Sequence, residues 1–409
     1  MKPSLPDFRS PDVLREHVLH TMSFYDGRCV DPSGGFYHFF KDDGTVYDAT
    51  TRHLVSSARF VVTHAMALRH FSGHARTAAW RDAAAHGLAF LRDAHRNPAT
   101  GGYAWLLRWD HGNKEILDPT NHCYGLAFVL LAHAQALLGG MDGARAGLEE
   151  TFELMEHRFW ESAQSLYADE ASVAWALSPY RGQNTNMHAC EALLAAHEAT
   201  GDPLYLQRAA MIADAVTHRL AAQTDGLVWE HYHVDWTPDW DYNRGDSSSI
   251  FRPWGFQPGH LAEWAKLLIT LERALPESAE GGPRVHRARE LFAAAVERAW
   301  DRQHGGLYYG FAPDHSICDH HKYFWVQAEA IAAAAVLGER TAEGHYWDWY
   351  DRLWAYCWEH FVDHQHGAWY RVLSADNHKL SDEKSPAGKV DYHTMGACYE
   401  AIAALTRRP

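Results

Sequence analysis

The stretch Gly34-Gly35-Phe36-Tyr37 begins a series of six short phrases in which a glycine or another turn residue leads into aromatic residues. The other five are Gly101-Gly102-Tyr103, Ser165-Leu166-Tyr167, Asp225-Gly226-Leu227-Val228-Trp229, Gly305-Gly306-Leu307-Tyr308-Tyr309 and His366-Gly367-Ala368-Trp369-Tyr370. The phrases recur about every sixty to eighty residues, a spacing that accommodates two helices and two connections. We therefore predict six helical hairpins, each closed by a short extended turn, that together form a ring.

Apolar residues at three- and four-residue spacing predict the helices of these hairpins. The charge-poor stretch Leu126–Leu138 is typical of a helix surrounded by others, whereas Thr77–His95 carries charges on one face and suits an outer ring. No Ser-, Pro- or Gly-rich linker divides the chain, so we predict an all-α (α/α)6 barrel in which residues 1–409 form a single domain. The twelve predicted helices span residues 11–26, 53–71, 77–95, 121–139, 142–159, 186–200, 203–222, 257–275, 284–300, 321–337, 345–361 and 391–405.

Composition and charge argue against several classes of protein. The formal net charge is −15 and the Lys and Arg residues do not cluster, so no nucleic-acid partner is expected. No run of about eighteen apolar residues is present, so no membrane span is expected. The segment Met1–Ser10 lacks an apolar core of the kind that directs secretion, and the six cysteines show no CxxC spacing. These features predict a cytoplasmic protein with reduced thiols.

Histidines gather at the predicted N-terminal ends of the inner helices. A single histidine at such a position is usually structural, but here one set falls in each hairpin. In a closed ring these six ends face the same side, where helix dipoles and imidazoles stabilise negative charge on a bound molecule. We therefore predict one cavity surrounded by Arg52-His53, Asn121-His122, Asn186 to His188, Pro258 to His260, His320-His321 and Asp391 to His393.

Two of these helices add a carboxylate three residues after the histidine, as His188 with Glu191 and His260 with Glu263. This spacing puts both side chains on one helix face, where a glutamate can fix the tautomer of an imidazole and raise its basicity. Two alternatives remain open: an ordinary core hydrogen bond, or a metal site, because His-x-x-Glu occurs in carboxylate-bridged dimetal proteins. No HExxH motif or Cys/His cluster accompanies the pairs, so we predict no bound metal.

Two long segments without helical period, Gln223–Phe256 and Val362–Lys389, are predicted on the same side as these helix starts. Long loops in compact proteins are usually functional or disordered, and the density of tryptophan disfavours disorder. A cavity of tryptophan, arginine, asparagine and histidine suits a sugar, because aromatic rings pack on its apolar faces while polar groups bind its hydroxyls. The alternative is that these tryptophans only fix the loops to the barrel.

Five runs of the sequence resemble the N-acylglucosamine 2-epimerase superfamily, and the resemblance extends over nearly the whole chain. Within that superfamily, the phrase Gly259-His260-Leu261-Ala262-Glu263-Trp264-Ala265-Lys266 is similar to the mannose isomerase branch of aldose-ketose isomerases. In the epimerase branches an isoleucine tends to precede the glutamate and a small residue to follow it. The five runs are Arg52-His53-Leu54-Val55-Ser56-Ser57-Ala58-Arg59-Phe60, Asn184-Thr185-Asn186-Met187-His188, Phe251-Arg252-Pro253-Trp254-Gly255-Phe256-Gln257-Pro258-Gly259-His260-Leu261-Ala262-Glu263-Trp264, Lys322-Tyr323-Phe324-Trp325-Val326-Gln327 and Asp391-Tyr392-His393-Thr394.

The resemblance implies an (α/α)6 barrel that holds a monosaccharide at its loop-rich end and needs neither a cofactor nor a metal. It implies that His260 and His393 are the catalytic acid/base pair, and that the substrate-binding residues are Arg52, Asn184, His188, Trp254, Glu263 and Trp325. The implied reaction interconverts D-mannose and D-fructose, or D-lyxose and D-xylulose, by proton transfer through a cis-enediolate. On this basis His393 moves the proton between C2 and C1, His260 acts in ring opening or at the oxygens, and Arg52 offsets enediolate charge.

Other functions remain compatible with such a ring. A 2-epimerase of the mannose/glucose type needs protons delivered to both faces of C2, and a sulfoquinovose isomerase needs a sulfonate contact, for which Arg244, Arg252 and Lys389 are candidates. A glycoside hydrolase needs two carboxylates at helix starts where this chain has histidine. A non-catalytic sugar-binding role leaves the two paired imidazoles unexplained. The oligomeric state stays open between a monomer and a homo-oligomer.

Overall fold

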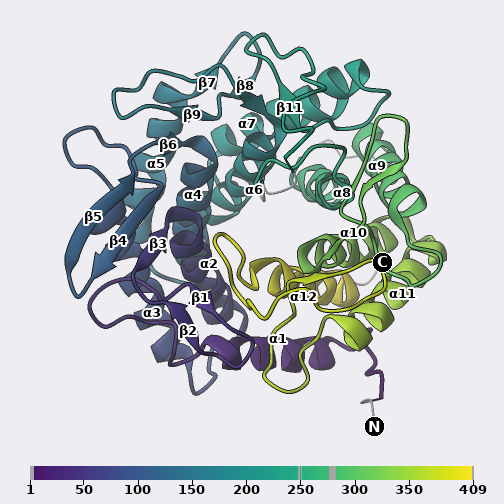
Figure 1. The fold of residues 1–409 in the computed structure, drawn as a ribbon, viewed down its shortest axis with the longest axis horizontal. Helices are drawn as coiled ribbons and strands as arrows, with labels where there is room; N and C mark the ends of the chain where they lie inside the picture. The colour runs from purple at the N-terminus through teal and green to yellow at the C-terminus, as the bar shows by residue number, and fades with distance from the viewer. Residues whose placement is uncertain (1–3, 247–248, 250, 276–281, 408–409) are drawn as a thin grey trace.

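The computed structural model describes residues 4–246, 249, 251–275 and 282–407, and these residues form twelve α-helices in two concentric rings (Figure 1). The inner ring consists of α2 (Leu54–His70), α4 (Cys123–Leu138), α6 (Gln183–Thr200), α8 (Pro258–Ala274), α10 (Phe324–Thr341) and α12 (Tyr392–Thr406). The outer ring consists of α1 (Pro11–Tyr25), α3 (Thr77–Phe90), α5 (Ala144–Arg158), α7 (Pro203–Asp214), α9 (Pro283–Ala299) and α11 (Gly344–His360). The prediction of an (α/α)6 barrel is confirmed.

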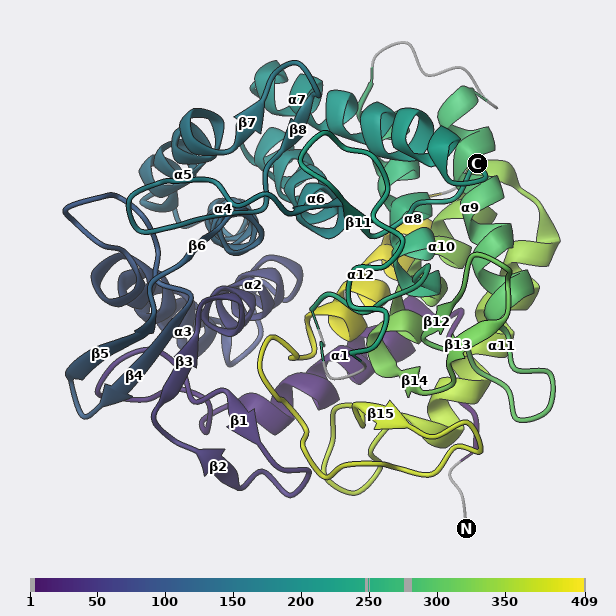
Figure 2. The same cartoon turned by 45° about the horizontal axis from the view of Figure 1, so that its top comes forward.

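The ring closes between the two ends of the chain (Figure 2). The first five inner helices each pack against the outer helix that follows them and against their inner neighbours. The sixth inner helix, α12, receives its outer partner from the other end of the sequence, because α1 packs against it, and it also contacts α2. The inner helices are therefore enclosed on most sides, which explains why α4 buries almost every residue from Leu126 to Ala136.

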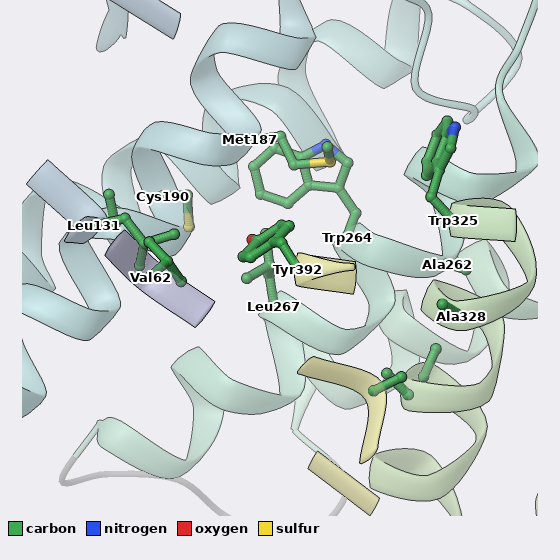
Figure 3. Packing of buried hydrophobic residues seen from close by; sticks show 14 of the residues in the cluster. Val62, Leu131, Met187, Cys190, Ala262, Trp264, Leu267, Trp325, Ala328 and Tyr392 are labelled. Carbon is green, nitrogen blue, oxygen red and sulfur yellow. The ribbon is translucent and has the colours of Figure 1, made fainter. Parts of the chain in front are cut away.

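Apolar side chains of the inner helices fill the barrel below its mouth, as a close view of part of the core shows (Figure 3). The labelled residues come from all six inner helices: Val62, Leu131, Met187, Cys190, Ala262, Trp264, Leu267, Trp325, Ala328 and Tyr392. All six cysteines are free, and five of them are buried. Within the described ranges, no helix has the length and apolar character that crossing a bilayer requires.

The six turn phrases lie where the outer helices end, and each contains a residue with positive φ: Gly35, Gly101, Ser165, Gly226, Gly306 and Gly367. Gly306 shows why glycine is used, because its φ is 79° and a Cβ atom there would overlap the Tyr356 ring. The chain then turns back on the end of the preceding outer helix, for example through the bridge between Trp300 and Leu307. The phrases therefore turn the chain back at the C-terminal end of each outer helix, at the start of the long connection to the next inner helix, rather than forming a short turn that closes a hairpin.

Short antiparallel strands attach the long loops to the starts of the inner helices. In four places the strand that directly precedes an inner helix pairs with a strand of the following connection. These pairs are β3 (Thr51–His53) with β4 (Leu106–Asp110), β6 (Asn121–His122) with β9 (Glu170–Ala171), β10 (Arg181–Gly182) with β11 (His231–Tyr232), and β14 (Lys322–Tyr323) with β15 (Val372–Leu373). The other strands are β1 (Phe39–Phe40) with β2 (Val46–Asp48), β5 (Asn113–Asp118) beside β4, β7 (Trp160–Glu161) with β8 (Leu166–Tyr167), and β12 (Gly310–Phe311) with β13 (Ile317–Asp319).

Two inner helices start at positions that differ from the prediction. Helix α10 begins at Phe324 rather than at residue 321, because Lys322 and Tyr323 are extended and pair with β15. Helix α6 begins at Gln183 rather than at residue 186, directly after the extended Gly182 that pairs with β11. Both corrections come from strand pairing between segments far apart in the sequence, which helical periodicity does not report.

Candidate active site

A cavity opens at the end of the barrel where the inner helices begin. Side chains reach it from the N-terminal turns of the inner helices and from the loops that the short strands hold over the mouth. Six of the eight residues predicted for the site line this one cavity: Asn184, His188, His260, Glu263, Trp325 and His393. The complete lining is Arg59, Tyr124, Asn184, His188, Phe251, Pro253, His260, Glu263, Tyr309, Trp325, Lys389 and His393.

His393 lies in the first turn of α12 and faces a glutamate of the neighbouring inner helix. Its Nδ1 atom is 2.7 Å from Oε1 of Glu329 on α10, and both side chains are almost fully buried. An ionised carboxylate only accepts hydrogen bonds, so with Glu329 ionised Nδ1 carries the proton and Nε2 keeps its lone pair. Burial, together with the nearby Arg59 charge, holds the pKa of His393 well below 6.5, so this imidazole is neutral at physiological pH.

His260 in the first turn of α8 has a similar arrangement. Its Nδ1 atom is 2.9 Å from Oε1 of Glu230, which lies immediately before β11. Gln183 lies beside this pair: its Oε1 accepts from Trp264 at 2.7 Å, and its Nε2 donates to Glu230 at 2.9 Å and lies 3.1 Å from Nδ1 of His260. An ionised Glu230 only accepts hydrogen bonds, so Nδ1 of His260 donates to it and Nε2 is the free nitrogen. The Trp325 ring is close to both histidines, with centroid distances of 5.0 Å to His260 and 5.6 Å to His393.

His188 is the third cavity histidine, and it forms the pair that the sequence predicts. Its Nδ1 atom is 3.0 Å from Oε2 of Glu191, one helical turn later on α6, and Tyr392 donates to the other oxygen of the same carboxylate. Burial opposes ionisation of Glu191, but the hydrogen bond from His188 and the Lys266 charge lower its pKa to about 2. Burial lowers the pKa of His188 to about 4, so this histidine is also neutral.

Several polar atoms in the cavity wall have no hydrogen-bond partner within the described part of the protein. They are Oδ1 of Asn184, both carboxyl oxygens of Glu263, and Nε1 of Trp325. Burial and the neighbouring Glu329 raise the pKa of Glu263 well above its ordinary value. Unpaired buried polar groups are costly, and here three of them converge on one small space. Donors and acceptors in this arrangement match the hydroxyl groups of a polyol.

The spacing of His260 and Glu263 is compatible with a shared ligand or with a direct bond, and the structure contains no direct bond between them. His260 bonds Glu230 instead, while Oε1 of Glu263 lies 3.8 Å from Nδ1 of His188 and 4.0 Å from Nζ of Lys266. The three-residue spacing places both side chains at the cavity, as expected. The partner of His260, however, comes from a loop that strand β11 holds against β10.

Arg52 is predicted to supply positive charge to the substrate, but its side chain does not line the cavity. Its guanidinium is fully buried against Asp31 at 2.5 Å, donates to the carbonyls of Ala49 and Thr51, and lies 5.3 Å from the Tyr37 ring centroid. Arg52 belongs to β3, and alternation along the strand directs its side chain away from the barrel mouth. Its contacts hold the segment before α2 in place.

Arg59, two turns into α2, is the guanidinium that reaches the cavity. The guanidinium is buried, and its Cζ atom lies 4.3 Å from the Phe128 ring centroid. It donates hydrogen bonds to the Gly388 carbonyl and, at 3.3 Å, to the Tyr124 hydroxyl. Lys389, from the loop before α12, is a second cation in the wall, 5.4 Å from the Trp325 ring centroid. Burial and the charge of Arg59 lower the pKa of Lys389 to about 7.

Trp254 is the second predicted substrate-binding residue that does not line the cavity. Its Nε1 donates to the carbonyl of Trp240 at 2.6 Å and its ring packs beside Trp229, so it fixes the loop rather than lining the cavity. Trp229 and Trp236 are fully buried in the same loop. The loop does supply Phe251, whose ring stacks on His53 with centroids 5.4 Å apart. The aromatic density therefore serves mainly to fix the loop, which is the alternative that the sequence left open.

The remaining histidines at helix starts do not line the cavity. His53 and His122 both pack against Trp105, at centroid distances of 4.4 and 4.0 Å. His320 and His321 are exposed in the turn before α10. Of the sequence pairs singled out for a shared cavity, only those in α6, α8 and α12 therefore converge there.

Two groups of side chains in or beneath the cavity bring potential metal ligands within 4.8 Å of one another: His188, Glu191 and Glu263, and Glu263, Glu329 and His393. Most of these ligand atoms are already paired, as His188 with Glu191 and His393 with Glu329. Positive charge is also already present, because Nζ of Lys266 donates to Glu329 at 2.7 Å and is 4.0 Å from Glu263. A metal ion here would have to compete with the ammonium group of Lys266.

Comparisons with known proteins agree with this fold. Residues 34–397 match the family model of N-acylglucosamine 2-epimerase. The chain is 50% identical over 405 residues to the D-mannose isomerase of Marinomonas mediterranea, covering 98% of this chain and 100% of that protein. It is 40% identical over 314 residues to the D-mannose isomerase of Thermobifida fusca, covering 76% and 75% of the two chains. A crystal structure of a D-mannose isomerase superposes with a TM-score of 0.92 at 50% identity, over 98% and 100% of the chains. This chain therefore belongs to the N-acylglucosamine 2-epimerase family.

Proposed function

We propose that this protein is an aldose-ketose isomerase that interconverts D-mannose and D-fructose. The observation that carries the proposal is the pair of buried histidines, His260 and His393, whose Nδ1 atoms are both held by glutamates and whose rings both lie beside Trp325. Nε2 of each is then available for proton transfer. The similarity to D-mannose isomerases supports mannose as the sugar. D-lyxose and D-xylulose, which lack only the terminal carbon, are a second expected pair.

We assign to His393 the transfer of the proton between C2 and C1 of the sugar. A neutral imidazole next to a carboxylate is a suitable general base, and burial keeps His393 neutral. It takes the proton from C2 of the open-chain aldose, the electrons move onto O1, and a cis-enediolate forms. The same nitrogen then returns the proton to C1, while O2 becomes the carbonyl of the ketose.

His260 is assigned the oxygen side of the reaction. It opens the sugar ring and moves the proton between O1 and O2 as the carbonyl changes position. The enediolate carries negative charge, and Arg59 and Lys389 in the cavity wall offset it in a site with little water. Asn184, Glu263 and Trp325 then satisfy their unpaired polar atoms by binding sugar hydroxyls.

The direct test uses mannose in deuterated water. The proposal predicts fructose with deuterium at C1, because the proton on His393 exchanges with solvent in part of the turnovers. A 2-epimerase instead gives glucose labelled at C2, and a sulfoquinovose isomerase converts that sulfonated sugar far faster than mannose. Glucose as the first labelled product, or no product from mannose, lyxose or sulfoquinovose, would contradict the proposal.

We further propose that the reaction needs no metal. Lys266 already supplies positive charge to the glutamates that could bind one, and the cavity cations serve the enediolate. Prolonged dialysis against a chelator should leave the rate of ketose formation unchanged. If activity disappears and returns on addition of a divalent cation, the site formed by Glu263, Glu329 and His393 is a metal site after all.

The cell compartment and the assembly state are further proposals. Six free cysteines, five of them buried, are compatible with the reducing conditions of the cytoplasm, where we place the protein. The net charge of −15 supports the absence of a nucleic-acid partner. The substrate pocket lies within a single chain, so a monomer and a homo-oligomer are both compatible with activity.

A further inference from the structure

A buried lysine lies directly behind the proposed base. Lys266 is in α8, and its Nζ atom donates to Oε2 of Glu329 at 2.7 Å, while the other oxygen of Glu329 faces Nδ1 of His393 at 2.7 Å. The Lys266 side chain is 10% exposed and that of Glu329 is 3% exposed. Lysine, glutamate and histidine therefore form one buried chain that ends at the nitrogen assigned to catalysis.

Lys266 does not line the active cavity. It lines a second cavity of about 460 Å³ at the opposite end of the barrel, together with Glu191, Glu329 and the far side of His393. Only His393 belongs to both cavities. Lys266 therefore acts on a bound sugar only through carboxylates: Glu329, which it hydrogen-bonds at 2.7 Å, and Glu263, whose Oε1 is 4.0 Å from Nζ.

The protonation state of Glu329 decides which nitrogen of His393 carries the hydrogen. An ionised Glu329 accepts from Nδ1–H, which leaves Nε2 as a base. A protonated Glu329 donates its own hydrogen to Nδ1, so the neutral imidazole must carry its hydrogen on Nε2, where it cannot take a proton from C2. Burial raises the pKa of Glu329, and the charge of Lys266 opposes this rise. The other titratable or charged groups facing this pair are His188, Glu191, Glu263, Arg59, Lys389 and Tyr392.

We propose that Lys266 is a positioning residue that keeps Glu329 ionised and thereby holds His393 in the tautomer whose Nε2 accepts the substrate proton. The inference deepens the proposed function, since it rests on His393 as the base. It also assigns a role to the lysine that ends the sequence phrase Gly259–Lys266. The ammonium is the nearest positive charge to Glu329, with a direct hydrogen bond, and it takes the place that a metal ion would otherwise fill.

The first test reads the tautomer without any sugar. In protein labelled with ¹⁵N-histidine, we expect His393 to show Nδ1–H and an unprotonated Nε2, identified by loss of its signals in His393→Gln. In Lys266→Met the tautomer should change to Nε2–H, and in Lys266→Arg it should remain as in the unchanged protein. Arg273→Met is the matched control, since Arg273 is on the same helix, lines the same rear cavity and pairs with Glu339. An unchanged tautomer in folded Lys266→Met would overturn the proposal.

The second test uses the pH profile of isomerisation. Without Lys266, ionisation of Glu329 requires a higher pH, so the acid limb of kcat should move to higher pH, with a loss of about tenfold or more at pH 6 that shrinks as pH rises. kcat should change more than KM, because the hydrogen bond of Lys266 goes to Glu329 behind the base, whereas the sugar-binding Glu263 is 4.0 Å away. Lys266→Arg should restore most of the profile. A loss of kcat that is equal at every pH would indicate a merely structural role and contradict the proposal.

A third variant covers the case in which Lys266→Met does not fold. In Glu329→Gln the ammonium of Lys266 attracts the amide oxygen, so the amide NH₂ turns to His393 and forces Nδ1 to accept. We expect the Nε2–H tautomer in this variant, and the Nδ1–H tautomer would overturn the proposal. If the unchanged protein converts none of the sugars, the proposed function fails, whereas the sugar-free spectra still decide the role of Lys266.

Discussion

Three cavity histidines share one arrangement, in which Nδ1 lies 2.7 to 3.0 Å from a glutamate oxygen and Nε2 is left free. The glutamates differ in origin: Glu191 is three residues from its histidine, Glu230 is thirty away and Glu329 is sixty-four away. Each fixes a ring orientation as well as a proton position. The chemistry of the site therefore depends on residues that never touch the sugar.

The clearest prediction at this scale concerns His393. Its replacement in His393→Ala should lower the exchange of the C2 proton of mannose by at least about a hundredfold, the effect expected for losing a general base. The measurement is loss of label from C2-deuterated mannose, followed by NMR. His321→Ala is the control, because His321 also precedes an inner helix but is exposed. Retention of more than a tenth of the original exchange rate would show that another group removes the proton.

A second prediction separates Arg52, in the strand before α2, from Arg59, within α2. Arg59→Lys keeps the charge but loses the planar fork in the cavity, so kcat for mannose should fall by about tenfold or more with little change in melting temperature. Arg52→Lys weakens the buried pair with Asp31 and should lower the melting temperature while kcat of the folded enzyme stays within about twofold. The opposite distribution of effects would restore Arg52 to the site.

Some of the cavity can be predicted from the sequence and some cannot. His188, His260 and His393 stand out because the hairpin repeat places them at equivalent helix starts. Arg59 and Glu329 carry a weaker signal, as charged residues within otherwise apolar inner helices, where an unpaired charge is costly. Glu230 carries none, and Lys389 is predicted only as one of three candidate sulfonate contacts, because the positions of both depend on how strands β11 and β15 hold the loops over the mouth.

At the scale of elements, the turns that end the outer helices can be predicted from sequence, whereas the strands that precede the inner helices cannot. Turn phrases and helical periodicity are local signals, so the helices and their order can be predicted from sequence. The strand pairs join residues fifty or so positions apart, as Lys322 with Leu373, and two to five residues are too short to show an alternating pattern. The prediction from sequence therefore misplaces the starts of α6 and α10, which are set by the strand pairs directly before them.

The turns give a prediction with an internal control. Gly306 and Gly101 have nearly equal φ angles, 79° and 74°, but a Cβ at Gly306 would overlap Tyr356 whereas none of the described atoms lies within 4 Å of a Cβ at Gly101. Replacing either glycine with alanine adds a left-handed backbone cost of about 1 kcal/mol. Gly306→Ala should therefore lower the free energy of unfolding in urea clearly more than Gly101→Ala. Equal losses would mean that the Tyr356 ring moves aside freely.

At the scale of the whole molecule, the barrel buries many histidines in neutral form. Burial lowers the pKa of His53 to about 3 and that of His17, His95, His122 and His188 to about 4. In the unfolded chain these groups titrate near 6.5. Below that pH the unfolded chain binds protons that the native protein does not, so the native state loses stability on acidification.

We therefore expect the melting temperature to fall steadily from about pH 6.5 to pH 4.5. Each such histidine contributes up to about 1.4 kcal/mol per pH unit within this window. Asp169, whose pKa burial raises to about 7, acts in the opposite direction, because protonation favours its folded environment. Calorimetry at constant ionic strength measures the sum. A melting temperature that is flat or rises toward pH 4.5 would show that buried carboxylates dominate.

The closure of the ring between α12 and α1 has a consequence for synthesis of the protein. A ribosome delivers α1 long before α12, the inner helix on which α1 packs, and α12 also carries His393. Until residues 392–406 emerge, α1, α2 and α10 each lack a neighbour and expose apolar surface. A chain interrupted by a premature stop therefore has no partial activity and offers chaperones and proteases an open edge. If His393 is the base as proposed, enzymatic activity requires that translation has passed through α12.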